Sequence, residues 1–293
     1  MKLLESIDNF LNYLRIELQR SPCTIDSYRK DLKYFHNYIS QVLKRDAFVK
    51  DITTYVIRKY LAYAKEVKGY SPRTMARNIA TLKSFFNFLE LEGLASNNAA
   101  KRLHCPKIPE TLPRHLSREE VERIFNAVDL SCDKGLRDIT ILKTLYYSGI
   151  RVSELVSLHV HDIINYEYLL VRQGKGGRFR YIPIHLKLRQ ALEIYMQKRL
   201  STSHYLFYSM KGNESISTQC VRLMVKEYAK KAGIDPARVT PHVFRHSFAT
   251  YLYKNGKIDL LRISKLLGHA NLRATTIYTH TSVDHLRDAI DKL

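Results

Sequence analysis

Apolar residues recur at helical spacing through the first hundred positions of the chain. This spacing is typical of amphipathic helices, each of which buries one face. Ser21 and Ser71 are each followed by proline, and a serine cap with proline in the first turn is a strong signal for a helix start. Four helices are predicted, over residues 3–18, 22–39, 56–64 and 72–89. The pattern therefore indicates a small helical domain over residues 1–105.

The helical pattern then stops. Three prolines within residues 106–113 exclude a regular helix and favour an extended chain, so this segment is predicted to be a linker. A new helix is predicted to begin at Ser117, because the serine and Glu120 have the spacing of a capping box. We therefore expect a second domain over residues 114–293.

The second domain is predicted to be mainly helical with one small antiparallel sheet. Residues 168–172 and 179–184 are rich in β-forming side chains and flank a glycine-rich stretch, residues 173–178. This arrangement predicts a hairpin with Lys175 at its tip. Helical patterns occupy most of the remaining domain, over residues 117–128, 139–145, 150–155, 186–200, 220–232, 241–254, 260–267 and 272–293.

The composition points to a polyanionic partner. The chain carries 48 lysine and arginine residues against 28 aspartate and glutamate residues, a formal net charge of +20. Both predicted domains share this excess, which favours a nucleic-acid duplex held from more than one side over a single basic tail. The alternative at this point is a basic protein that binds nucleic acid only weakly.

The cysteine pattern and the hydropathy indicate a cytoplasmic protein. The four cysteines lie far apart and lack the spacing of a zinc site or a disulfide framework. No window is apolar for long enough to be a signal peptide or a membrane span. We therefore expect a soluble protein that is associated with the nucleoid and needs neither a metal nor another cofactor.

His242 and Arg245 are candidates for phosphate chemistry. They lie three residues apart in a helix predicted to begin at Pro241 with Thr240 as its cap, so they share one face. An arginine can hold two phosphate oxygens with its fork, and a histidine can accept or share a proton near neutral pH. The alternative for this pair alone is a structural histidine and a surface arginine.

Four more residues have side chains suited to the same chemistry. Arg151 follows a predicted turn at the start of a helix, where Glu154 would brace its side chain or the local backbone, and Lys175 is the hairpin lysine. His269 follows a glycine that is predicted to end a helix, and Tyr278 comes later. A phenol has a pKa of about 10, so Tyr278 needs cations or a base nearby to act as a nucleophile. Taken alone, Arg151 and Lys175 are typical of solvated surface cations, and a tyrosine such as Tyr278 is more typical of packing than of a nucleophile.

Taken in order, these residues resemble the six active-site positions of the tyrosine recombinases: Arg151, Lys175, His242, Arg245, His269 and Tyr278. The sequences around these positions are also similar to the family, and the resemblance is to its Xer-type and integrase branch. It spans nearly the whole chain. It implies that residues 1–105 form a helical, SAM-like core-binding domain that binds DNA. Residues 114–293 would form the catalytic domain, which ends in a tail helix.

The resemblance implies a site-specific recombinase that cuts and rejoins duplex DNA and exchanges strands between two sites, without metal or ATP. Tyr278 would attack the scissile phosphate to form a 3′-phosphotyrosyl intermediate. Arg151 and Arg245 would neutralise the non-bridging oxygens as charge builds. His242 would contact phosphate and assist proton transfer from the tyrosine.

The remaining roles and the partners also follow from the resemblance. Lys175 would protonate the leaving 5′-oxygen, and His269 would hydrogen-bond the phosphate. The partners would be double-stranded DNA with a specific recombination site and further protomers, in a homotetramer or a heterotetramer with a paralogue, together with an accessory activator in some members. The tail beyond Tyr278 would dock on a neighbouring protomer or pack on its own domain. Integration or excision of mobile DNA and resolution of chromosome dimers both stay open.

Two other functions use similar residues. A type IB topoisomerase would nick, swivel and reseal one duplex with nearly the same side chains, and a catalytically silent regulator would only bind DNA. The small N-terminal helical domain favours recombination over the topoisomerase. The presence of all six residues disfavours the regulator.

Overall fold

The protein folds as two compact units, Met1–Thr111 and Leu112–Leu293. The structure is a computed structural model that describes residues 1–108, 115–172, 179–199, 201–255 and 259–268. Most of the predicted linker, residues 106–113, lies outside these ranges. Each unit is therefore described by itself. None of the helices in the described ranges is long and apolar enough to cross a membrane.

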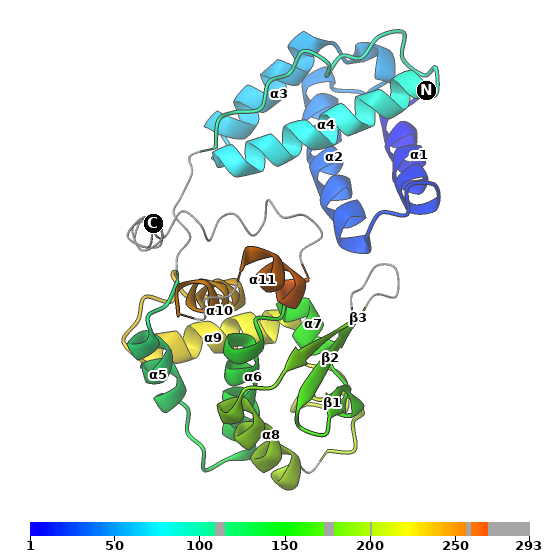
Figure 1. The fold of residues 1–293 in the computed structure, drawn as a ribbon. Coiled ribbons are helices and arrows are strands. Elements are labelled where there is room, and N and C mark those ends of the chain that lie inside the picture. The colour runs from blue at the N-terminus through cyan, green and yellow to red at the C-terminus, as the bar shows by residue number, and fades with distance from the viewer. Residues whose placement is uncertain (109–114, 173–178, 200, 256–258, 269–293) are drawn as a thin grey trace, which may run out of the picture. The chain divides into compact units, whose positions relative to one another are not determined.

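The N-terminal unit is a bundle of four helices, as predicted (Figure 1). Its two Ser-Pro signals act as expected: Ser21 Oγ accepts the Thr24 N–H at 3.3 Å, and Ser71 Oγ accepts the Thr74 N–H at 3.2 Å. The serine side chains thus satisfy donors that the first helical turn leaves open. The helices are α1 (Leu3–Ile16), α2 (Pro22–Leu43), α3 (Thr54–Glu66) and α4 (Pro72–Leu91), with a short 3-10 turn η1 (Val49–Asp51) before α3.

Several aromatic side chains pack against one another in the core of this unit. Phe10 of α1 meets Phe85 of α4 edge-on with ring centroids 5.5 Å apart, and both rings are fully buried. A buried carboxylate also joins two helices, since Asp31 of α2 pairs with Arg77 of α4 at 2.9 Å and accepts the Thr81 hydroxyl at 3.0 Å. Burial raises the pKa of Asp31 despite these partners. The unit is therefore held by an apolar core that also contains a buried polar contact between α2 and α4.

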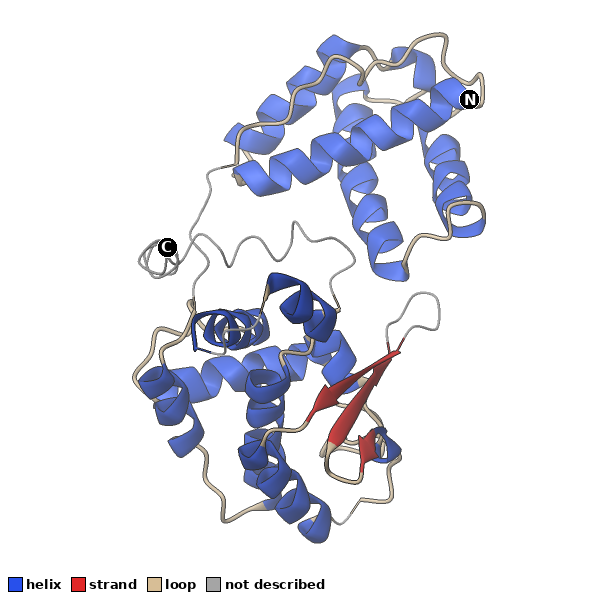
Figure 2. Cartoon of the chain, viewed as in Figure 1, coloured by secondary structure: helices blue, strands red, loops and turns tan. Residues whose placement is uncertain are grey.

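The C-terminal unit is mainly helical with a small sheet at one edge (Figure 2). Helix α6 lies at its centre, packed against α8 and α10. The predicted capping box is present, because Ser117 and Glu120 exchange hydrogen bonds with each other's backbone N–H groups at 3.2 and 2.9 Å. The helices are α5 (Arg118–Asn126), α6 (Asp133–Ser148), α7 (Val152–Val156), α8 (Leu186–Lys198), α9 (Thr218–Lys231), α10 (Pro241–Asn255) and α11 (Leu260–Leu267), with a 3-10 turn η2 (Val160–Asp162).

The sheet confirms the predicted hairpin and adds a strand. Strands β2 (Tyr168–Arg172) and β3 (Phe179–Pro183) pair antiparallel, and the loop between them, residues 173–178, lies outside the described ranges. A third strand, β1 (Ile163–Ile164), pairs with β2 in the order β1-β2-β3. Sequence periodicity missed β1 because two residues are too few to show an alternation.

Candidate active site

A turn at Gly149 positions two arginines of the candidate site. Helix α6 ends at Gly149, whose φ of +61° lies in the left-handed region. A Cβ at this position would lie 2.3 Å from Cδ1 of Phe248 on α10, so the close approach of the turn to α10 also requires glycine. The turn brings Arg151 to the start of α7 and points the Gly149 carbonyl at Arg245 of α10.

Arg151 is fixed by Glu154 in two ways. The Arg151 backbone N–H donates to Glu154 Oε2 at 2.8 Å, and its Nη1 donates to Oε1 at 2.9 Å. The predicted brace thus acts on the side chain and on the backbone together. Nη2 donates to the Gly268 carbonyl at 3.0 Å, while the side chain stays 41% exposed. Arg151 is therefore held in place yet open to solvent.

Arg245 is held by backbone carbonyls at two helix ends. Its Nη1 donates to the Gly149 carbonyl and its Nη2 to the Leu267 carbonyl, both at 2.8 Å, and the residue is only 2% exposed. The carbonyls at the C-terminal end of a helix lack partners within that helix and carry partial negative charge. A guanidinium fork that satisfies two of them joins the end of α6 to the end of α11.

Two histidines of α10 lie beside this arginine. Thr240 caps the helix start as predicted, since the Val243 N–H donates to its Oγ1 at 3.3 Å. The ring of His242 reaches solvent, and partial burial together with the charges of Arg245 and Arg151 lowers its pKa. The ring of His246 meets it edge-on, with centroids 4.4 Å apart, and burial lowers the pKa of His246 to about 4. Both rings are therefore neutral at neutral pH, and a neutral imidazole can accept a proton.

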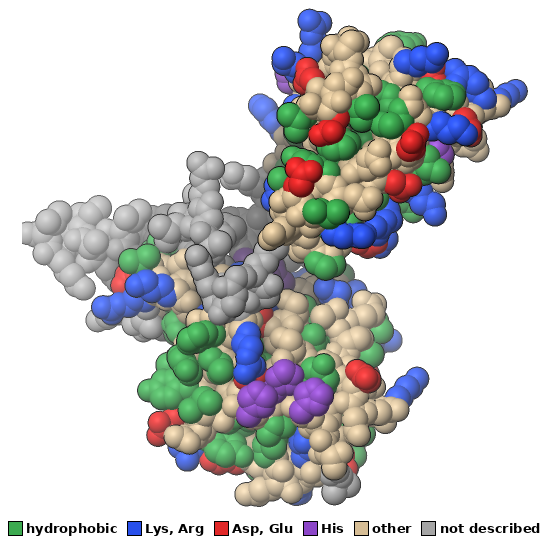
Figure 3. All heavy atoms as spheres, turned by 90° about the vertical axis from the view of Figure 1, so that its right-hand side faces the viewer, with side chains coloured by type: hydrophobic (Ala, Val, Ile, Leu, Met, Phe, Trp, Pro, Cys, Tyr) green, Lys and Arg blue, Asp and Glu red, His purple; other side chains and the backbone are tan. Residues whose placement is uncertain are grey.

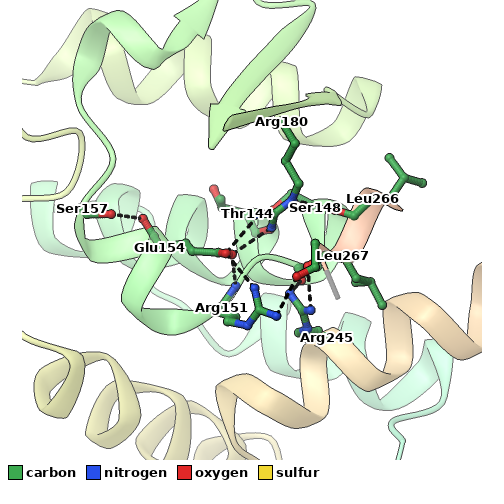
Figure 4. A network of polar contacts seen from close by, with 11 residues as sticks. Thr144, Ser148, Arg151, Glu154, Ser157, Arg180, Arg245, Leu266 and Leu267 are labelled. Atoms are coloured by element: carbon green, nitrogen blue, oxygen red, sulfur yellow. Dashed lines mark hydrogen bonds and ion pairs between the residues drawn. The ribbon is translucent and has the colours of Figure 1, made fainter. Parts of the chain in front are cut away.

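Arg180 of β3 is a site residue that sequence reasoning missed (Figure 4). Its Nη1 and Nη2 donate to the two oxygens of Glu154 at 3.0 and 2.9 Å, and its Nε donates to the Leu266 carbonyl at 2.8 Å. The side chain is 9% exposed. One signal was present in the sequence: Arg180 has the same strand face as the buried Ile182, so the alternation of β3 turns an arginine inward.

The carboxylate of Glu154 is ionised in this setting. Burial alone raises its pKa, but hydrogen bonds from Arg180 and from the Arg151 backbone, together with both positive charges, outweigh burial and leave the pKa below its ordinary value. The carboxylate is 8% exposed. A buried negative charge thus lies between two arginines and is balanced by them.

Three guanidinium groups together hold the end of α11. They donate to three successive carbonyls of the chain, which belong to Leu266, Leu267 and Gly268. Gly268 has a φ of +65° and ends the helix, as predicted. The donors come from β3, α10 and the start of α7, so tertiary contacts rather than local sequence position this helix end. The donors are, in the same order, Arg180, Arg245 and Arg151.

The structure brings together three of the six predicted site residues. Arg151, His242 and Arg245 come from distant parts of the chain, and both arginines act on the pKa of the histidine. Lys175, His269 and Tyr278 lie outside the described residues, as does the predicted tail helix, and their roles stay predictions. His269 is nevertheless the next residue in the chain after Gly268, whose carbonyl Arg151 holds.

Comparison with known proteins decides the family. Residues 114–285 match the model of the phage integrase family, and residues 7–93 match the phage integrase N-terminal SAM-like domain. The chain belongs to the tyrosine recombinase family. This tyrosine recombinase is similar to the XerA recombinase of Pyrococcus horikoshii, with 41% identity over 290 residues that cover 98% of this chain and 92% of the relative. It is also similar to the XerC recombinase of Oceanobacillus iheyensis, with 36% identity over 98% of this chain and 94% of the relative.

Solved structures agree with this assignment. A crystal structure of a XerA recombinase aligns with a TM-score of 0.55 at 30% identity, and covers 99% of this chain and 98% of that one. The structure of XerH bound to a difH substrate aligns with a TM-score of 0.75 at 22% identity over 98% and 95% of the two chains, which supports the fold. The fold prediction, a helical SAM-like domain followed by a catalytic domain with a small antiparallel sheet, is confirmed. The enzyme is a site-specific recombinase of the Xer type, which cuts and rejoins DNA.

Proposed function

We propose that this recombinase exchanges strands between two duplex sites through a 3′-phosphotyrosyl intermediate. Tyr278 attacks the scissile phosphate, a new P–O bond to the phenolic oxygen forms, and the bond to the 5′-oxygen breaks. The released 5′-hydroxyl of a partner strand then attacks the phosphotyrosine and restores a phosphodiester with release of the tyrosine. The bond energy is kept in the intermediate throughout, so the exchange needs no nucleotide hydrolysis.

The meeting of Arg151, Arg245 and His242 is the observation that carries this proposal. Two guanidinium groups held in place by the protein stabilise the negative charge that develops on the non-bridging oxygens. They need no reorganisation at the moment of reaction, because Glu154 and the carbonyls at the helix ends already orient them. His242 is neutral beside them and is suited to assist proton transfer from the attacking phenol.

The two other proposed roles belong to residues outside the described ranges. Lys175 lies in the chain between β2 and β3 and protonates the leaving 5′-oxygen, and His269 hydrogen-bonds the phosphate. Site arginines contact the described residues that lie near each of them in the chain. Arg180 belongs to β3, which follows Lys175, and Arg151 donates to the carbonyl of Gly268, the residue before His269. These contacts support their assignment to one site.

We further propose that the recombinase acts as a tetramer on two DNA sites, with residues 1–105 as a core-binding domain. The formal charge of +20 supports a large DNA footprint, and lysine and arginine side chains lie on both units in the face that Figure 3 shows. Among proteins of the same fold, lambda integrase has been solved as a tetramer bound to a Holliday junction. The second pair of protomers is identical to the first or comes from a paralogue. The tail beyond Tyr278 links neighbouring protomers, and recombination takes place at the nucleoid.

A covalent trapping experiment tests the nucleophile. On cleavage, a substrate nicked just beyond the scissile phosphate of the cognate site loses the short fragment that carries the new 5′-hydroxyl. The reverse reaction is then blocked, so the wild-type enzyme accumulates as a protein–DNA adduct. Tyr278→Phe is expected to form no adduct, because it lacks the attacking oxygen. Tyr181→Phe is the matched control, since Tyr181 is an exposed tyrosine of β3, and it should form the adduct normally. An adduct with the Tyr278 variant would contradict the proposal.

A second assay separates recombination from topoisomerase activity. A plasmid with two cognate sites should give deletion or inversion products with the wild-type enzyme. If every site-bearing plasmid is only relaxed and no exchanged product forms, the enzyme nicks and reseals a single duplex, and the strand-exchange proposal fails.

A further inference from the structure

Arg180 lies where β3, α7 and α11 meet. All three of its guanidinium nitrogens donate hydrogen bonds within the protein: Nη1 and Nη2 to the carboxylate of Glu154, and Nε to the Leu266 carbonyl. Its side chain is 9% exposed. These bonds assign Arg180 a role toward other residues of the site.

The first of these residues is Arg151, which Arg180 reaches through Glu154. Each carboxylate oxygen accepts one bond from Arg180 and one from Arg151, as Figure 4 shows for the two side chains that converge on Glu154. Without Arg180, the buried carboxylate would have Arg151 as its only ion-pair partner among the described residues. Arg151 would then be drawn toward Glu154 and away from the Gly268 carbonyl, because an unpaired buried charge is costly.

Arg180 also holds the end of α11. The Leu266 carbonyl accepts from Arg180, and the next two carbonyls accept from Arg245 and Arg151. Helix α11 has only eight residues, and its apolar contact with α10 is made by Leu260, Ile263 and Leu267. Short helices are marginal without tertiary support, so the three arginines supply much of what holds its end in place.

We propose that Arg180 is a positioning residue of the recombinase, which holds Arg151 through Glu154 and holds the end of α11 directly, so that both keep the geometry that strand cleavage requires. The proposal rests on the proposed function for its catalytic consequence. Its structural part, that Arg180 secures α11, does not depend on that function. Arg180 also belongs to β3, the strand that follows residue 178 in the chain.

The test compares Arg180→Gln and Arg180→Lys with Arg172→Gln. Arg172 is the matched control, because it lies on the neighbouring strand β2 and also pairs with a buried carboxylate, Asp162, at 2.6 Å. Among the described residues it makes no hydrogen bond or ion pair to α7 or α11. Lysine keeps the positive charge of Arg180 but cannot reproduce its fork. Thermal unfolding of each variant first establishes that it is folded.

Hydrogen–deuterium exchange of the full chain without DNA measures the structural part. Peptides that cover α11 (Leu260–Leu267) should exchange about tenfold faster in Arg180→Gln, since a charge-assisted hydrogen bond has been removed from the helix end. Arg172→Gln should leave the exchange of α11 unchanged. Unaltered exchange of α11 in the Arg180 variants, or equal acceleration in the Arg172 variant, overturns the holding role.

Single-turnover cleavage at saturating DNA measures the catalytic part. Arg180→Gln should cleave roughly tenfold to a hundredfold more slowly, because small misplacements of catalytic groups have effects of this size. DNA affinity should stay within about threefold, since the phosphate contacts that set affinity are elsewhere. The cleavage rate of Arg180→Lys should lie between those of Arg180→Gln and wild type. If the glutamine variant does not fold, the rate of the lysine variant tests the positioning role.

A double variant tests whether Arg180 acts through Glu154. Glu154→Gln combined with Arg180→Gln should cleave no more slowly than the slower single variant, because both changes disrupt one unit. Fully additive losses, or a folded Arg180 variant that cleaves at the wild-type rate, refute the positioning role. If the wild-type enzyme itself forms no covalent adduct, the proposed function fails, while faster exchange of α11 still supports the structural part.

Discussion

Gly149→Ala is the substitution for which the structure makes its sharpest prediction. Gly149 has a φ of +61°, and an added Cβ would lie 2.3 and 2.8 Å from Cδ1 and Cε1 of Phe248 and 3.1 Å from Cδ2 of Leu267. Contacts below 3.0 Å do not occur between such atoms, so the aromatic ring or the turn must move. Both choices disturb Arg245, whose two carbonyl acceptors belong to Gly149 and Leu267.

The magnitude follows from two separate costs. A left-handed conformation costs an alanine about 1–2 kcal/mol, of which roughly 0.4–1 kcal/mol is offset because alanine restricts the unfolded chain. Forcing a methyl group into a packed region costs about 1–3 kcal/mol more. We therefore expect Gly149→Ala to lower the free energy of unfolding by about 2–4 kcal/mol, and to slow strand cleavage as well.

Gly233→Ala separates the two costs. Gly233 follows α9 in the same unit, has a φ of +69°, and has no atom within 4 Å of the position of an added Cβ. It should show only the conformational cost, about 1 kcal/mol or less. Urea denaturation followed by circular dichroism gives both values on the unfolding transition of the same unit, so the difference between the variants measures the steric cost alone.

Gly149→Ala in a Phe248→Ala variant tests whether the contact with the Phe248 ring causes the loss of stability. Phe248→Ala removes both ring atoms that the new methyl group would meet, so in that background Gly149→Ala should cost little more than Gly233→Ala does. The reasoning is refuted if Gly149→Ala is no more destabilising than Gly233→Ala, or if its full penalty persists without the ring.

Three further predictions concern the site itself. Arg245→Lys cannot hold both the Gly149 and the Leu267 carbonyl, so the free energy of unfolding should fall by about 2–3 kcal/mol and the covalent adduct should disappear, as denaturation and gel assays would show. His246 has a pKa of about 4 in the folded protein and of about 6.5 in the unfolded chain, so between these values only the unfolded chain takes up a proton. The contribution of His246 to stability should therefore be complete above pH 6.5, and the free energy of unfolding should fall by up to about 3 kcal/mol as the pH drops to about 4. His246→Gln should flatten this part of the stability profile, and an unchanged slope would contradict the assignment. Lys175→Ala should cleave slowly and recover when the leaving 5′-oxygen is replaced by sulfur, which needs no proton to leave; no recovery would argue against the lysine as general acid.

Much of the fold could be predicted because its signals are local. A serine followed by proline satisfies the donors of a helix start wherever it occurs, and Ser21 and Ser71 do so here. Glycine alone adopts a left-handed turn without strain, which marked the ends of helices at Gly149 and Gly268. The hairpin of β2 and β3 followed from β-forming residues around glycines, whereas β1 is too short to leave a pattern.

Part of the candidate site could also be predicted, because the chemistry of a phosphate limits the side chains that can hold it. The sequence resembled the tyrosine recombinases through six residues in order: Arg151, Lys175, His242, Arg245, His269 and Tyr278. The alternation of β3 could place Arg180 on the same face as Ile182, but it could not identify the partners of the arginine. Its role depends on the carboxylate and the carbonyl that it meets, and both are distant in sequence.

The sequence by itself thus determined most of the described helices, the β2–β3 hairpin and the kind of chemistry, because these depend largely on residues within a turn or two of one another. Only the tertiary structure decided how the site is held together. Residues from β3, from the start of α7 and from α10 converge on three carbonyls at the end of α11, and Glu154 joins two of the arginines. Helix-end carbonyls and a buried carboxylate attract whichever cations the fold brings within reach, and no local pattern records which ones those are.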